Sequence, residues 1–168
     1  SEVMQGIEGL DYNSWKELTC EERLSVLQEL EYKVAEIEHR PASVVRMEDL
    51  GDPSVHKGYC QQNFWGNNST LTLNSQCLSD SSMSEYFESL DTVIHEGRHA
   101  YQNYNLDHRE VNPDMVSTSE WRQNMEEGYR SPELYGFRAY WAQPVEVDAR
   151  DFAQNVIDQY KQSQGYFA

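Results

Sequence analysis

The residues His95-Glu96-Gly97-Arg98-His99 have types and spacing that could do chemistry. On a helix, side chains four residues apart project from the same face, so His95 and His99 can bind one cation together. Imidazoles are typical zinc ligands, and Glu96 lies close enough to accept a proton from a metal-bound water. The segment therefore predicts a catalytic Zn2+ site with His95 and His99 as ligands and Glu96 as the general base.

A catalytic zinc ion needs a third protein ligand, which must come from elsewhere in the chain. The downstream candidates are Asp107, His108, Glu126, Glu127 and Glu146. The metzincin motif, which supplies a third histidine soon after the second, would need Gly at 102 and His at 105. Gln102 and Asn105 stand there instead, which disfavours His108. Asp107 has no supporting pattern, and Glu126 and Glu127 are typical of solvated charge on a helix.

Glu146 is the strongest candidate because of its place on the last predicted helix. An apolar stripe that includes Ala149, Phe152 and Ala153 runs along this helix. On a helical wheel Glu146 lies about 60° from Ala149, at the edge of the stripe, whereas Asp148 lies about 100° away on the other side. A carboxylate at the edge of a buried face must be paired or bind a metal. Asp148 fits a partner for a ligand histidine or a surface acid, and the alternative for Glu146 is pairing with an arginine or the helix N-terminus.

Together the His-Glu-x-x-His segment and the downstream Glu146 resemble the gluzincin branch of the zincin metallopeptidases, which includes thermolysin. The resemblance implies a helix-rich domain with a small mixed sheet, whose edge strand holds an extended peptide. It makes His95, His99 and Glu146 the ligands and Glu96 the base. Members of that branch often have an Asp four residues after the ligand Glu, where this chain has Arg150; Asp148 or Asp91 would have to substitute.

The layout of the chain also resembles small metallopeptidase domains at the C-terminal ends of secreted bacterial polymorphic toxins. That resemblance implies a secreted bacterial protein or a fragment of one, with an immunity or inhibitor protein as partner. The chain begins at Ser1 without a Met, which we interpret as a processed product or a fragment.

Length and charge narrow the class of protein further. We expect 168 residues to form a single domain spanning 1–168. Thirteen basic and 29 acidic residues give a net charge of −16, which disfavours nucleic acid and anionic membranes as partners. No apolar run reaches membrane-spanning length, so the chain as given is expected to be soluble. Three cysteines at no metal-ligand spacing indicate neither a disulfide framework nor a zinc ribbon.

The predicted helices and strands that must position the site indicate an α+β fold, zincin-like and helix-rich. A capping box at Thr19 to Glu22 starts a long amphipathic helix to about residue 39, and Ser84 is expected to cap the helix with the motif. Residues 44–47 and 69–74 read as strands, and we expect 69–74 to be a half-buried edge strand beside the cleft. The helices predicted after the motif helix are a short one capped by Ser119, a short stretch over 131–141, and a last one from Pro144.

The leading functional hypothesis is a zinc-dependent peptidase acting on a peptide or protein. Strand 69–74 would pair with the substrate, and Tyr140, Tyr135 or Arg138 would stabilise the oxyanion. Two alternatives stay open. One is a zinc-dependent amidase or a maturation protease of narrow specificity, and the other is a non-catalytic interaction domain with a degenerate motif.

Overall fold

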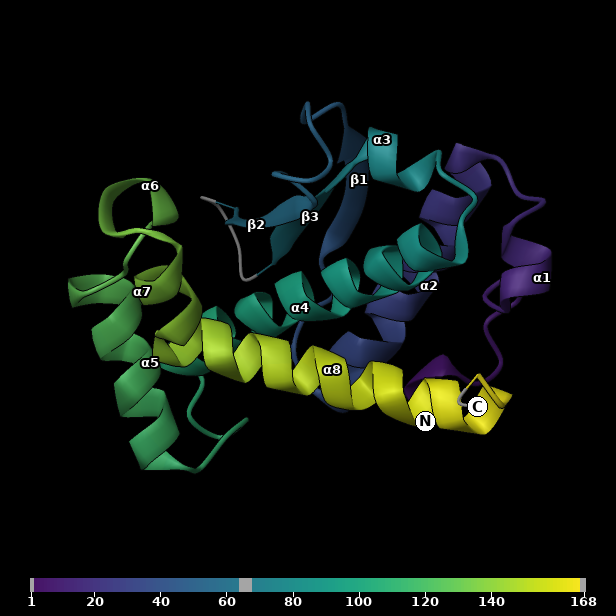
Figure 1. Ribbon diagram of the computed structural model, residues 1–168. Coiled ribbons are helices and arrows are strands. Elements are labelled where there is room, and N and C mark those ends of the chain that lie inside the picture. Colours follow the sequence, from purple (N-terminus) through teal and green to yellow (C-terminus); the bar gives the residue numbers. More distant parts are fainter. Residues whose placement is uncertain (1, 64–67, 167–168) are drawn as a thin grey trace.

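Helix α4 (Met83–Asp107) runs through the middle of the molecule, between a small sheet and the last helix, α8 (Pro144–Gln164) (Figure 1). The computed structural model describes residues 2–63 and 68–166. Helices dominate and the sheet is small and mixed, so the fold is α+β, as predicted. Because α4 carries the motif, the sheet and α8, which pack on either side of it, help to position the candidate site.

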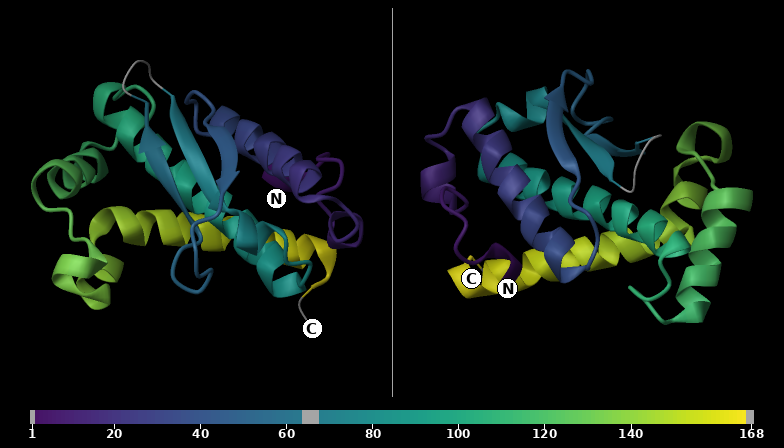
Figure 2. Two further views of the ribbon diagram at one scale, coloured as in Figure 1. Left: turned by 90° about the horizontal axis from the view of Figure 1, so that it is seen from above. Right: turned by 180° about the vertical axis from the view of Figure 1, so that it is seen from behind.

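Helices and strands follow one another in a simple order along the described chain. The elements are a 3-10 turn at Glu2–Met4, α1 (Tyr12–Trp15), α2 (Cys20–Ile37), β1 (Val44–Glu48), β2 (Gly58–Gln62), β3 (Ser69–Asn74), α3 (Ser75–Leu78), α4, α5 (Met115–Glu127), α6 (Pro132–Tyr135), α7 (Phe137–Ala142) and α8. Helix α2 flanks α4 beside the sheet, and α5 to α7 gather at one end (Figure 2).

The long helices begin where side chains can satisfy their first N–H groups. Thr19 and Glu22 form the predicted capping box of α2, with both reciprocal hydrogen bonds present. Pro144 occupies the first turn of α8, as predicted. The cap predicted for α4 is wrong by two residues: Ser82, not Ser84, accepts from the Glu85 N–H. The motif is helical, as predicted, since it lies within α4, which continues unbroken for about seven turns beyond this cap.

The sheet has the order β1-β3-β2, with β1 parallel and β2 antiparallel to β3. Residues 69–74 form a strand, but the prediction that it is a half-buried edge is wrong, since β3 is the central strand and almost wholly buried. The prediction was wrong because the polar side chains of β3 are mostly buried and form hydrogen bonds with other segments of the protein. The Ser69 hydroxyl pairs with that of Ser43 at 2.6 Å, and the Asn74 amide donates to the His56 carbonyl at 2.7 Å. The edge strand on the α4 side is β2, which the sequence analysis did not identify.

Two further boundaries differ from the predictions. Helix α5 begins at Met115, where Asp114 accepts from the N–H groups of the first turn, rather than at Ser119. The stretch 131–141 forms two short helices, α6 and α7, separated by Gly136. Just before α5, the side chains of Asn112 and Asp114 accept hydrogen bonds from nearby backbone N–H groups.

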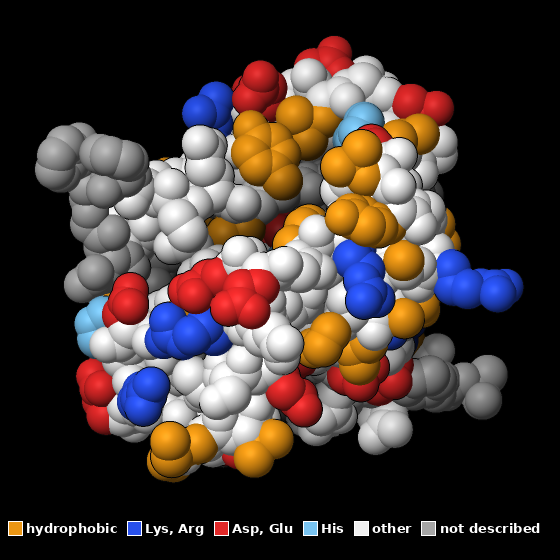
Figure 3. Space-filling view, turned by 90° about the vertical axis from the view of Figure 1, so that its left-hand side faces the viewer, with side chains coloured by type: hydrophobic (Ala, Val, Ile, Leu, Met, Phe, Trp, Pro, Cys, Tyr) orange, Lys and Arg blue, Asp and Glu red, His pale blue; other side chains and the backbone are white. Residues whose placement is uncertain are grey.

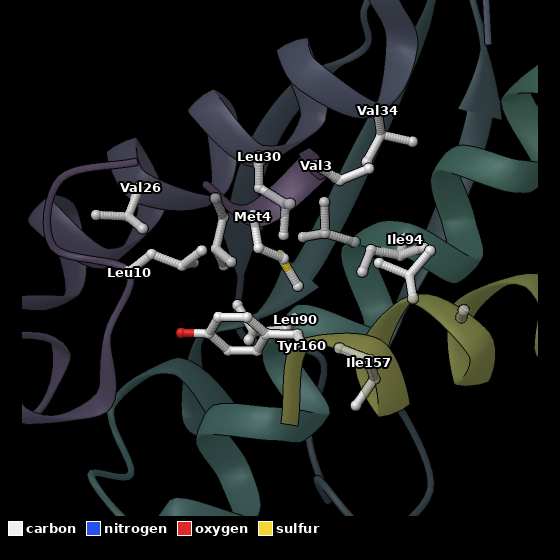
Figure 4. Packing of buried hydrophobic residues seen from close by; sticks show 14 of the residues in the cluster. Val3, Met4, Leu10, Val26, Leu30, Val34, Leu90, Ile94, Ile157 and Tyr160 are labelled. Atoms are coloured by element: carbon white, nitrogen blue, oxygen red, sulfur yellow. The ribbon is translucent and has the colours of Figure 1, made fainter. Parts of the chain in front are cut away.

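The main core lies between α2, the sheet, α4 and α8. Leu30 of α2, Leu71 of β3, Leu90 and Ile94 of α4, and Tyr160 of α8 pack together there, several of them visible in Figure 4. A smaller cluster of Tyr101, Trp121 and Val145 joins α4, α5 and the start of α8. Both clusters fix the crossing of α4 and α8, which is where the candidate site forms.

Two negative findings apply to the described part of the chain. None of its helices is long and apolar enough to cross a membrane. Cys20, Cys60 and Cys77 are all free thiols.

Candidate metal centre

The structure brings His95, His99 and Glu146 together where α4 crosses the first turn of α8. The Nε2 atom of His95 lies 3.1 Å from Oε2 of Glu146, and that of His99 lies 3.2 Å from Oε1. The two imidazole rings are 4.9 Å apart and nearly perpendicular. Glu146 is 3% exposed, so the carboxylate predicted at the edge of the apolar stripe is buried against the histidines.

The donor set fits a zinc ion in chemistry and in size. Two imidazole nitrogens and a carboxylate oxygen, one from each residue, lie within 4.8 Å of one another. Four ligands placed tetrahedrally at zinc bond lengths lie about 3.3 Å apart, close to the histidine-to-glutamate distances here. The three side chains therefore have the chemistry and spacing with which a metal ion such as zinc could be held.

Electrostatics at the cluster favour charged forms that hold the three side chains together. Burial raises the pKa of Glu146, but hydrogen bonds and charge from both histidines outweigh it and hold that pKa well below its usual range. Burial lowers the pKa of His99, whereas the hydrogen bond to Glu146 and the charges of Glu96 and Glu146 raise it to about 9. Glu146 is therefore ionised at neutral pH, as a metal ligand must be.

Glu96 lies beside the cluster, at the meeting of two cavities. The first cavity, of about 560 Å3, lies on the His95 side, and the second, of about 400 Å3, lies on the side of His99 and Glu146. Gly58, Glu96 and Tyr140 line both, so the two form one cleft past the cluster. Burial raises the pKa of Glu96, the nearby imidazoles oppose this, and the Glu146 charge reinforces it. A carboxylate with a raised pKa accepts a proton more readily, which suits a general base.

Two tyrosines reach Glu146 from the opposite side of the cleft. Tyr140, predicted as an oxyanion donor, lines both cavities, and Tyr129, which the sequence analysis did not single out, donates to Glu146 Oε1 at 3.3 Å. Burial, followed by the charge of Glu146, raises the pKa of both phenols, so both remain O–H donors at neutral pH. The other predicted donors, Tyr135 and Arg138, are exposed and line neither cavity.

Cys60 of β2 lines the second cavity and could compete as a nucleophile or ligand. Burial, followed by the charge of Glu96, raises its pKa to about 12. A thiol with this pKa is protonated at neutral pH, and only the thiolate attacks or binds metal readily. Cys60 is therefore a weaker candidate for chemistry in the cleft than the carboxylates and imidazoles.

Asp148 was predicted to be either a partner of a ligand histidine or a surface acid, and in the structure it is linked to His99 through Gln102. Asp148 accepts from Arg98 Nε at 2.8 Å and from the Gln102 amide at 2.8 Å. Gln102 is the residue that contacts the ligand, since its Oε1 lies 2.9 Å from His99 Nδ1. The signal that could have found it is local: Gln102 is three residues after His99 and shares its helix face. Asp91, the other candidate, lies one turn before His95 and lines the first cavity.

The other candidate third ligands lie away from the cluster. His108 stacks on Tyr104 and donates from Nδ1 to the Tyr104 carbonyl at 3.0 Å. Glu126 pairs with Arg122 on the surface, and Asp107 and Glu127 are exposed. Within residues 2–63 and 68–166, the one cluster of three or more His, Cys, Asp or Glu side chains placed so that it could hold a metal ion is that of His95, His99 and Glu146.

Two glycines allow neighbouring chain segments to approach α4 at the site. A Cβ at Gly97, inside the motif, would lie 2.8 Å from Arg40 Nη2 and 2.9 Å from Glu31 Oε2, which form a fully buried ion pair. A Cβ at Gly58 would lie 2.7 Å from the Thr72 carbonyl oxygen and 2.9 Å from the Thr92 side chain. Gly97 thus admits the buried ion pair against α4, and Gly58 admits the edge strand.

Exposed apolar side chains surround one end of the cleft. Helices α6 and α7 leave Leu134, Tyr135, Phe137 and Trp141 largely exposed, and Phe137 and Trp141 also line the first cavity. Hydrophobic side chains gather beside a hollow on the face that carries these helices (Figure 3). The end of the cleft on the His95 side is therefore bordered by apolar surface.

Comparison with protein families, with curated protein sequences and with solved structures gives no significant match. A function is therefore assigned from the residues of the cleft alone.

Proposed function

We propose that this protein is a zinc-dependent peptidase, with His95, His99 and Glu146 as metal ligands and Glu96 as the general base. The observation that carries the proposal is the convergence of the three donor atoms beside Glu96 in an open cleft. Zinc bound to these residues would lower the pKa of its water and polarise the carbonyl of the bond to be cut.

The side chains of the cleft have separable roles in this proposal. Glu96 accepts a proton from the attacking water and returns it to the leaving amine. Tyr140 donates its O–H to the carbonyl oxygen as negative charge develops there, and Tyr129 is the second donor within reach of Glu146. The gluzincin resemblance also implies these roles, and it implies that an extended peptide binds along an edge strand.

Substrate binding is assigned to β2 rather than to β3. Gly58 lines both cavities, and Tyr59 and Cys60 line the second, so the first three residues of β2 border the cleft. As an edge strand β2 has backbone groups that β3 does not pair, and an extended peptide can add to such an edge. The apolar walls of the first cavity would then receive a substrate side chain.

The first experiment measures metal and activity together. Protein purified without chelator should contain one zinc per chain and cleave casein, and removal of zinc with a chelator should abolish cleavage until zinc is restored. Absence of stoichiometric zinc would instead favour a non-catalytic interaction domain. Cleavage of small amides without cleavage of casein would favour an amidase or a peptidase of narrow specificity.

The second experiment separates the base from the ligands. Glu96→Gln should lower turnover by roughly 10²–10⁴-fold while zinc remains bound, because the amide cannot accept the proton. The matched control is Glu29→Gln, which changes an exposed acid on α2 and should leave turnover unchanged. Retained activity in Glu96→Gln would remove Glu96 from the mechanism.

The toxin resemblance adds a biological role to the proposal, that of a secreted effector protease restrained by an immunity protein. Expression of the wild-type chain in bacterial cells should then arrest growth, whereas the Glu96→Gln variant should not. Equal growth of the two strains would contradict the toxin role and leave the peptidase proposal to the assays above.

A further inference from the structure

We propose that Gln102 is a positioning residue, which fixes the tautomer and orientation of His99 for metal binding through Nε2. This inference rests on the metal site of the proposed function and assigns a role that the ligand set alone does not. Gln102 is fully buried and lies between His99, Val145 and Asp148. It is therefore placed to act on α4 and α8 at once.

The contacts of Gln102 determine which way its amide points. Its Nε2 lies 3.0 Å from the Val145 carbonyl oxygen and 2.8 Å from the Asp148 carboxylate, both of which can only accept. The –NH2 group must face these two acceptors, so Oε1 must face His99. Because Oε1 can only accept, the proton of that hydrogen bond belongs to His99 Nδ1. When His99 gives up one proton to bind a metal, Gln102 retains the proton on Nδ1, so the lone pair is on Nε2, the atom that faces Glu146.

Gln102 also bears on the position of Glu146. Val145, whose carbonyl accepts from Gln102, immediately precedes Glu146 in the first turn of α8. One side chain therefore holds a ligand histidine through its oxygen and the backbone beside a ligand glutamate through its nitrogen. This arrangement couples the two helices that must meet for the ligand set to form.

A chain of ion pairs, partly buried at Arg98–Asp148 and fully buried at Arg40–Glu31, holds Gln102 and Asp148 in turn. Arg98 donates to Asp148 at 2.8 and 3.2 Å and to Glu38 at 2.9 Å, and its guanidinium lies over the rings of Tyr101 and Phe152. Glu38 accepts from Arg40, which pairs with Glu31. The contacts thus run from the core of α2 to His99, and both central residues of the motif, Gly97 and Arg98, serve them.

The two ligand histidines differ in this respect. Within the described part of the chain, the one side-chain hydrogen bond of His95 is to Glu146, whereas His99 has both Glu146 and Gln102. Residues that hold the far nitrogen of a ligand histidine typically contribute 10–100-fold to metal affinity. We therefore assign to Gln102 a measurable share of the affinity of this site.

The test replaces Gln102 by leucine, which has a similar shape and cannot accept from Nδ1. Zinc affinity, measured by competition with a chromophoric chelator, should fall by roughly 10–100-fold. The matched control is Gln28→Leu on α2, away from the site. It removes an amide that donates to the Ser43 carbonyl and accepts from the Val45 N–H. Gln28→Leu should lower the melting temperature and leave zinc affinity unchanged.

A second measurement reports on the hydrogen bond itself and does not depend on metal. In nitrogen-15 NMR the His99 Nδ1–H should exchange slowly in wild-type protein, with or without zinc, and rapidly in Gln102→Leu. If Gln102→Leu does not fold, Asp148→Asn serves as the milder variant and should weaken zinc binding by less than tenfold.

The outcomes separate this inference from the proposed function. Zinc affinity within twofold of wild type in Gln102→Leu, with an unchanged Nδ1–H signal, would overturn the inference even if the wild-type chain is an active peptidase. A wild-type chain that binds no zinc would contradict the proposed function, whereas the exchange measurement would still decide whether Gln102 holds His99.

Discussion

The wall of the cleft that carries the proposed metal ligands, here called the ligand wall, is built largely from buried residues. The wall formed by α6 and α7 contains no buried residue. Glu146, Gln102 and Val145, where α4 meets α8, are at most 3% exposed. In contrast, helices α6 and α7, which lead up to α8 and carry Tyr140, have no buried residue, and Leu134 is 82% exposed. One cleft thus joins a closely packed wall to a lightly packed one.

This difference matches what each wall is proposed to do. Metal ligands must be held in fixed geometry, and buried hydrogen-bonded side chains on long helices provide it. Elements that meet substrate are drawn from the less stable parts of a fold, because few buried contacts oppose their movement. The comparison therefore predicts large effects for substitutions on the ligand wall and small ones for most of the α6–α7 wall.

The largest effect is expected from loss of the buried ligand. Glu146→Ala leaves two histidines to hold the metal, so zinc affinity should fall by more than the roughly 100-fold typical of supporting residues, and peptidase activity should fall to background. Chelator competition and casein cleavage measure both. The control, Asp151→Ala, removes an exposed acid of the same helix and should change neither. Wild-type zinc affinity in Glu146→Ala would remove Glu146 from the ligand set.

The next effect concerns stability and compares a glycine that is closely packed inside the motif with one that has room for an added Cβ. Gly97→Ala would force its Cβ against the buried Arg40–Glu31 pair and should lower the free energy of unfolding by about 1–3 kcal/mol in urea titrations. At Gly128, after α5, the nearest atom to an added Cβ is 3.8 Å away, so Gly128→Ala should change it by less than about 0.5 kcal/mol. Equal effects at both positions would contradict the difference in packing.

Tyr140 is the exception expected on the lightly packed wall. Tyr140→Phe should lower kcat by roughly 10²-fold with zinc affinity unchanged, because one donor to the developing oxyanion is lost. The exposed Tyr135 gives the matched control, and Tyr135→Phe should leave kcat unchanged. A larger loss of kcat in Tyr129→Phe than in Tyr140→Phe would transfer the role to Tyr129.

The smallest effect is expected at the exposed Leu134, and the buried Leu90 provides the comparison. Leu90 of α4 is fully buried, and Leu90→Ala should cost about 2–5 kcal/mol of unfolding free energy. Leu134→Ser on α6 should change that free energy by less than about 0.5 kcal/mol, since little apolar surface leaves water there on folding. Urea titrations measure both, and a cost above 1 kcal/mol for Leu134→Ser would show that the α6–α7 wall is better packed than its exposure indicates.

Local patterns in the sequence predicted the parts of the site that depend on helical period. The spacing of His95 and His99 placed them on one face, and the stripe through Ala149 placed Glu146 at a buried edge, where the structure has it. Both inferences use only the 3.6-residue repeat and the cost of burying a carboxylate. Such arguments need no knowledge of what packs against the helix.

Contacts between distant segments could not be predicted in this way. Strand β3 reads as polar and half-exposed until Ser43 and His56, from other segments, satisfy its side chains. The bond between Gln102 and Asp148 joins residues 46 apart in the chain, and that between Arg98 and Glu38 joins residues 60 apart. The order of the strands and the choice of β2 as the cleft edge depend on such pairings.

By itself, the sequence determined the helix that carries the motif, the shared face of the two histidines and the place of Glu146 at the edge of an apolar stripe, because hydrophobic periodicity is a property of each helix alone. The tertiary structure decided what supports these ligands and what meets a substrate: Gln102 behind His99, Gly97 beneath the Arg40–Glu31 pair, β2 at the edge, and two tyrosines opposite. These features arise only when α2, the sheet, α4 and α8 pack together, since hydrogen bonding and close approach between segments depend on where each segment lies in space.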